Sequence, residues 1–122
     1  MTALKIEPGR SPEVVEIDES LDSLQAEVGG MIEVLYPFAD EVALICNEEG
    51  KLLGMPPNRS LRHPESGSIY DIVCGPMLLC GAPLEKDSFG DLTPEQLDFY
   101  QNTYAVPEVF LYTGAGILVM KG

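Results

Sequence analysis

The sequence has no tryptophan, a single histidine and only three cysteines. Three cysteines are too few for a disulfide scaffold, and an odd number cannot all be paired within the chain. Cys46, Cys74 and Cys80 lie among apolar residues, which favours reduced, buried thiols and a cytoplasmic location. No Cys-x-x-Cys pair occurs, and His63 has no second histidine beside it. We therefore expect no metal site and no cofactor.

A long hydrophobic run is also missing. The longest apolar stretch, residues 72–82, is interrupted by Pro76 and is far shorter than the ~20 residues that cross a membrane. The first residues include Lys5 and an early Glu7, but not the apolar segment that is typical of a secretory signal. We expect no membrane association.

Basic residues are scarce, because 7 lysines and arginines stand against 20 aspartates and glutamates, for a net charge of −13. Seven of the acids fall in residues 1–27, seven in 28–80 and six in 81–122, which is an even distribution. Such a surface repels nucleic-acid phosphates, so we expect no direct nucleic-acid binding. It would attract a basic protein surface, or only keep the protein soluble.

Assembled catalytic sets are absent as well. There is no Gly-x-Ser-x-Gly nucleophile elbow. The acidic residues that follow Cys46 favour a raised thiol pKa, the opposite of what a nucleophile needs. Gly114 and Gly116 supply only two of the three glycines of a dinucleotide fingerprint, and no helix is expected after them. We predict no catalytic residue and a protein that is not an enzyme.

What the sequence does contain is a series of short strands and two helices. A serine before and two glycines after an apolar pattern of helical period predict a helix over residues 20–29. Thr93 followed by Pro94 is a typical helix start and predicts a second helix over residues 93–105. Because the strands cluster instead of alternating with helices, we predict an α+β fold, with a mostly antiparallel sheet in a single domain over residues 1–122.

The predicted strands are residues 3–7, 14–17, 31–38, 42–46, 52–55, 69–74 and 77–80.

Two segments carry further predictions. We expect residues 42–46 and 52–55 to form a hairpin that residues 56–59 end, followed by an exposed loop over residues 60–68. The C-terminal end is predicted either as a last hairpin or as a poorly ordered tail, flexible over residues 113–122.

One short region departs from the acidic composition. Lys51, Arg59 and Arg62 place three of the seven basic residues within twelve positions. They indicate either a contact for an anion or ordinary surface ion pairs with the abundant acids. We take Asn58, Arg59, Arg62 and Tyr70 as candidate ligand-binding residues.

Three groups of short motifs follow one another along residues 4–104. They are Leu24-Gln25 with Val28-Gly29-Gly30-Met31-Ile32-Glu33, then Asn47-Glu48-Glu49-Gly50-Lys51-Leu52 with Pro56-Pro57-Asn58-Arg59, then Asp71-Ile72-Val73-Cys74-Gly75-Pro76 with Gly81. Their order resembles a small domain of unknown function found in bacteriophages and in mobile elements of gut Gram-positive bacteria. The resemblance implies a cytoplasmic accessory protein, often encoded near anti-restriction genes, with no established activity and no catalytic residues to carry over.

Two functions stay open at this point. The first is a non-enzymatic acidic interaction protein that docks on a basic host protein surface, as a nucleic-acid mimic acting against a host nuclease or defence system. The alternative is a module that binds a small, nucleotide-like anion with the region around residues 58–62. If the last hairpin is ordered, its unpaired edge also favours a homodimer.

Overall fold

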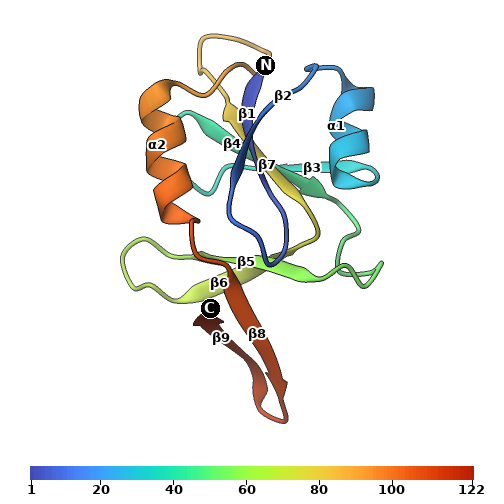
Figure 1. The fold of residues 1–122 in the computed structure, drawn as a ribbon, viewed down its shortest axis with the longest axis vertical. Coiled ribbons are helices and arrows are strands. Elements are labelled where there is room, and N and C mark those ends of the chain that lie inside the picture. Colours follow the sequence, from blue (N-terminus) through green and yellow to red (C-terminus); the bar gives the residue numbers. More distant parts are fainter.

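The computed structural model describes residues 1–122 and contains nine strands and two helices (Figure 1). The α+β class predicted from the sequence is confirmed, and all strand pairs are antiparallel. The elements in chain order are β1 (Thr2–Ile6), β2 (Glu13–Glu16), α1 (Leu21–Val28), β3 (Ile32–Leu35), β4 (Val42–Asn47), β5 (Pro57–Arg62), β6 (Ile69–Cys74), β7 (Met77–Gly81), α2 (Pro94–Thr103), β8 (Glu108–Thr113) and β9 (Gly116–Lys121).

Five strands form the central sheet, in the order β2-β1-β7-β4-β3. Strand β4 pairs with β3 on one edge and with β7 on the other, and all its residues are buried. Its side chains alternate between two apolar clusters, with Val42, Leu44 and Cys46 in one and Ala43 and Ile45 in the other. The central sheet is therefore apolar on both faces and needs cover on both.

The two helices provide that cover from opposite sides of the sheet (Figure 1). Helix α1 packs on one face through Leu24 and Val28. On the other face, Tyr100 of α2 joins the larger cluster together with Leu61 and Val73 of the β5–β6 pair. Neither helix has the length and hydropathy that a helix needs to cross a membrane.

Both predicted helices are confirmed, and the residues at their ends explain why. The Ser20 hydroxyl accepts from the backbone N–H of Ser23 at the start of α1, and Gly29 ends that helix with a φ of 79°. At the start of α2, Thr93 and Gln96 each accept from the other's backbone N–H, which is a capping box. These bonds satisfy backbone groups that a helix end otherwise leaves open.

The predicted hairpin of residues 42–46 and 52–55 is wrong. Both edges of β4 are already occupied, so the later segment finds no free edge there. Residues 49–54 instead form turns, in which Leu52 is 86% exposed and Gly54 adopts a φ of 71°.

The segment that was expected to be turn and loop is in large part a strand. Residues 57–62 form β5 and pair with β6, so that the exposed loop is limited to residues 63–68. Pro57 is the first residue of β5, a position at which a strand tolerates the missing N–H.

For the C-terminal residues, the sequence predicted either a hairpin or a poorly ordered tail, and the structure shows the hairpin. Strands β8 and β9 pair over their full lengths around a turn at residues 113–116. The hairpin extends away from the rest of the molecule beyond the β5–β6 pair (Figure 1).

Candidate functional site

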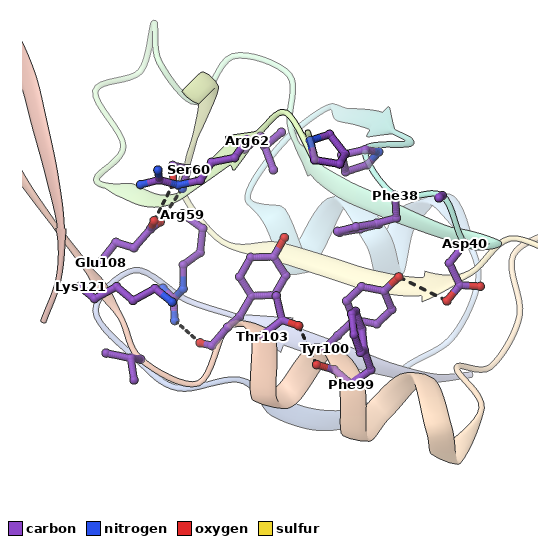
Figure 2. Close-up of a pocket in the computed structure, with 16 residues that line it drawn as sticks. Phe38, Asp40, Arg59, Ser60, Arg62, Phe99, Tyr100, Thr103, Glu108 and Lys121 are labelled. Atoms are coloured by element: carbon purple, nitrogen blue, oxygen red, sulfur yellow. Dashed lines mark hydrogen bonds between the residues drawn. The ribbon is translucent and has the colours of Figure 1, made fainter. Parts of the chain in front are cut away.

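A cavity with a volume of about 840 Å³ lies between β5 and α2 (Figure 2). The segment that links β3 to β4 lines one end of this cleft, and the base of the β8–β9 hairpin lines the other. Four separate parts of the chain therefore contribute to one site. We call it the β5–α2 cleft.

One end of the β5–α2 cleft is aromatic. The ring centroids of Phe38 and Tyr100 are 4.8 Å apart, and those of Phe99 and Tyr100 are 4.9 Å apart in an edge-to-face arrangement. The Tyr100 hydroxyl donates to Asp40 Oδ2 at 3.3 Å. Burial, together with the negative charge of Asp40, raises the pKa of Tyr100 to about 12, so this phenol is neutral at physiological pH.

The other end of the cleft is basic. Arg59, Arg62 and Lys121 line it, which brings three of the seven basic residues of the protein into one cavity. The ion pairs in the structure involve only the N-terminus, Lys5 and Lys51, so none of these three cations is paired with a carboxylate.

A glutamate from the hairpin also reaches this end. Both carboxylate oxygens of Glu108 accept hydrogen bonds from Ser60 at 2.5 Å, one from its backbone N–H and one from its hydroxyl (Figure 2). This contact joins the first residue of β8 to β5. The same carboxylate favours the charged form of the nearby Arg59. The basic end of the cleft thus already accommodates one carboxylate from the chain itself.

Arg59 is only 1% exposed, and its side chain joins three segments of the chain. Its Nη1 donates to the backbone oxygen and to Oδ1 of Asn58, while Nη2 donates to the carbonyls of Arg10 and Tyr104 at 2.7 and 2.9 Å. The Tyr104 carbonyl lies at the C-terminus of α2, where a cation is favourable. Desolvation lowers the pKa of Arg59, and its buried Nε has no hydrogen-bond partner.

Asn58 is fully buried, contrary to the expectation that it is available for binding. Its Nδ2 donates to the carbonyls of Ile6 and Gly75 at 2.7 and 2.9 Å, and its Oδ1 accepts from Arg59. All its polar capacity serves the fold, because these bonds hold β5 against the end of β1 and the turn before β7.

Tyr70 lies apart from the β5–α2 cleft. It lines a second cavity of about 540 Å³ and stacks on His63 with a centroid distance of 4.7 Å. Lys51 lines the same cavity and forms an ion pair with Asp71. Of the four candidate residues, the structure brings two arginines together in the main cleft and leaves the other two outside it.

Several residues of the cleft were not found by sequence reasoning. Phe38, Asp40, Glu108 and Lys121 come from segments that are far apart in the chain. Tyr100 lies within the second helix predicted from the sequence, residues 93–105, which was a usable signal. No comparable pattern marks the other four, because Phe38 and Asp40 reach the cleft by contacting Tyr100 of α2, and Glu108 and Lys121 reach it through the docking of the hairpin on β5.

The cysteines are protonated and buried or partly buried. Desolvation, aided by the charge of Glu33, raises the pKa of Cys46 to about 12, and burial alone raises that of Cys80 to about 12. The raised pKa of Cys46 agrees with the expectation, but its causes are burial and a neighbour on the adjacent strand, not the acids that follow it in sequence. Thiols of this kind are poor nucleophiles.

The fold and the cleft define a small α+β domain with a cavity that is aromatic at one end and basic at the other. The chain belongs to the DUF3846 family, a domain of unknown function, whose family model matches residues 1–105. This confirms the resemblance to a domain of unknown function, while the phage or mobile-element origin stays a prediction. The match ends before β8, so Glu108 and Lys121 lie beyond it. No curated protein and no solved structure matches the chain.

Proposed function

We propose that the β5–α2 cleft binds a small anionic molecule with a flat ring, of the nucleotide class. The observation that carries this proposal is the grouping of Arg59, Arg62 and Lys121 in one cavity of a protein whose net charge is −13. Together with the two carboxylates of Asp40 and Glu108, these residues give the cleft a net charge of +1, from three cations and two anions. An anion is therefore favoured here and opposed by most of the remaining surface.

The basic end of the cleft has hydrogen-bond donors to offer. Arg62 is exposed and uses one Nη1 bond on the carbonyl of Gly67, so most of its guanidinium is free for a phosphate or carboxylate. Arg59 is buried and its terminal nitrogens donate to oxygens of the chain, so it contributes positive charge to this end of the cleft and Arg62 contributes the free donors. These donors support phosphate recognition.

The aromatic end supplies a surface for the ring. Phe99 is 61% exposed although it lines the cavity, and it lies against Tyr100. Stacking on such a side chain is favourable for any base, because every base has a π-face. Asp40 lies beside this end (Figure 2) and would accept a hydrogen bond from an amino or hydroxyl group of the ligand.

Calorimetry and thermal denaturation with inorganic phosphate, AMP, ATP and adenosine test this proposal. We expect at least one phosphate-bearing nucleotide to raise the melting temperature and adenosine to have a smaller effect. Replacing Arg62 by Ala should lower the affinity about tenfold, the loss expected for one charge-assisted hydrogen bond. Arg10→Ala is the matched control, because it removes the same charge from an exposed side chain outside the cleft. A flat response to all four probes, or equal binding by both variants, would contradict the proposal.

The exposed acids support a second function. None of the 20 carboxylates is buried, and 16 belong to exposed residues. We propose that an accessory protein of this charge docks on a basic host surface and acts as a nucleic-acid mimic toward a nuclease or defence enzyme. Carboxylates that stay hydrated and unpaired can occupy a channel built for phosphates.

A competition assay tests this second function. Purified host nucleases and restriction enzymes would cleave a labelled DNA in the presence of increasing protein. We expect inhibition of at least one enzyme at low salt and its loss at high salt, because the attraction is screened. Glu48→Gln combined with Glu49→Gln removes two adjacent exposed charges and should weaken the inhibition, whereas Gln101→Ala, which changes no charge, should not. Unchanged cleavage throughout the panel would remove this function.

A further inference from the structure

Ser60 directs two hydrogen-bond donors at a single anionic group in the basic end of the β5–α2 cleft. Its backbone N–H and its hydroxyl donate to the two oxygens of the Glu108 carboxylate at 2.5 Å each, and both residues line the cavity (Figure 2). Two donors that converge on the oxygens of one ionised group form an oxyanion site, and charge-assisted hydrogen bonds of this kind are the strong ones. We call the N–H and the hydroxyl of Ser60 the Ser60 subsite.

Glu108, which occupies the Ser60 subsite, belongs to a lightly attached part of the chain. Apart from its two bonds to Ser60, no hydrogen bond or ion pair joins residues 108–122 to residues 1–105. No residue of the β8–β9 hairpin is buried, and its two strands form a separate sheet that projects from the molecule (Figure 1). A two-stranded sheet with so little support moves at a low free-energy cost. The carboxylate can therefore leave Ser60 while the core stays folded.

We propose that the Ser60 subsite receives the phosphate of the nucleotide-class ligand proposed above, on whose binding this inference rests, and that Glu108 is an intramolecular competitor which the phosphate displaces. The carboxylate lies where a ligand phosphate would meet the same two donors. Arg62 and Lys121 line the same end of the cleft, and neither is paired with a carboxylate.

Charge favours the phosphate over the carboxylate at this position. A carboxylate brings one negative charge and uses both oxygens on Ser60, whereas a phosphate monoester brings a charge of about −1.5 to −2 and a third oxygen. That oxygen can accept from Arg62, whose guanidinium makes only one hydrogen bond, to the carbonyl of Gly67. The displaced Glu108 also has a cation at hand, because the pairing register places Lys121 directly opposite it. After the exchange, both anions have a cationic neighbour.

Calorimetry with AMP and adenosine, on the wild type and on Glu108→Gln, tests the proposal. A glutamine is uncharged and accepts through one oxygen only, so it competes poorly for two donors. AMP should bind Glu108→Gln about tenfold more tightly than the wild type, because the carboxylate no longer reduces the fraction of protein that is open to the phosphate. The affinity for adenosine, which has no phosphate, should not change.

Glu65→Gln is the matched control. Glu65 is an exposed residue of the loop after β5 and does not line the cavity, so this variant makes the same chemical change and removes the same charge outside the subsite. It should bind AMP like the wild type. An equal gain in Glu65→Gln would show that net charge alone sets the affinity, and this would overturn the proposal.

Hydrogen exchange on the wild type detects the displacement without any variant. AMP should speed the exchange of the backbone amides of residues 108–121, which lose their attachment to β5, while the N–H of Ser60 stays protected by the phosphate. Hairpin amides that exchange at the same rate or more slowly with AMP overturn the proposal, even if Glu108→Gln is poorly folded.

The two proposals for this cleft fail in different ways. Wild-type binding of AMP that Glu108→Gln does not strengthen overturns the competitor and leaves the proposed function in place. A gain of equal size for adenosine does the same, because the substitution would then only loosen the cleft. If neither the wild type nor Glu108→Gln binds AMP, the competitor and the proposed function both fall.

Discussion

At the scale of single residues, the most informative position is Asn58. An asparagine after two prolines is typical of a turn, but here its side chain lies inside the protein and makes three hydrogen bonds. Two of them reach the carbonyls of Ile6 and Gly75, which belong to parts of the chain far from β5. A buried amide in this position holds separate segments together and leaves none of its own polar atoms open.

Replacing Asn58 by Ala should lower the free energy of unfolding by about 2–4 kcal/mol. The change leaves two buried carbonyls and one Arg59 donor without a partner, and each unsatisfied group costs about 1–3 kcal/mol, offset in part by relaxation. Urea denaturation followed by circular dichroism measures the effect. Asn102→Ala is the control, because Asn102 is exposed and its only side-chain bond is a 3.5 Å contact with Asp98. A loss below about 1 kcal/mol for Asn58→Ala would show that these bonds contribute little to stability.

At the scale of elements, those that form through contacts between residues close in the sequence could be predicted, and those that form through contacts between distant residues could not. The two helices were predictable because their signals are local: Ser20 and Thr93 cap them, and Gly29 ends the first. Strand β5 was not, because its residues become a strand only through pairing with β6 and burial beneath the central sheet. The predicted hairpin of residues 42–46 and 52–55 is wrong for the same reason, because both edges of β4 pair with other strands, β7 and β3.

The candidate site follows the same rule. Arg59 and Arg62 could be grouped from the sequence because they are only three positions apart in the chain. Lys121 could not, because it reaches the cleft only after the β8–β9 hairpin docks through Glu108. Sequence reasoning therefore located one wall of the β5–α2 cleft and missed the parts that close it.

At the scale of the whole molecule, ionisable groups divide into two sets. The carboxylates are all at least partly exposed, whereas the two phenols of α2 and its C-cap, Tyr100 and Tyr104, are enclosed by the packing of α2. Burial raises the pKa of Tyr104 to about 12, with Glu108 adding to the shift, and Tyr100 is raised to the same range. The fold therefore depends on phenols that stay neutral, and this makes its stability sensitive to alkaline pH.

The free energy of unfolding should fall as the pH rises from about 10 toward 12. Tyr100 and Tyr104 have a pKa of 10.0 when unfolded and about 12 when folded, so above pH 10 the unfolded chain binds fewer protons and is favoured. The stabilisation is complete below pH 10 and is lost as the pH passes through the folded values; Cys46 and Cys80 act in the same direction from pH 9.0. Urea denaturation at increasing pH, with tyrosinate absorbance read in parallel, measures it. Tyr100→Phe should make the decline shallower, and Tyr112→Phe, at a tyrosine that is 70% exposed, should not. A stability that stays level to pH 12 would show that both phenols ionise as freely in the folded protein as in the unfolded chain.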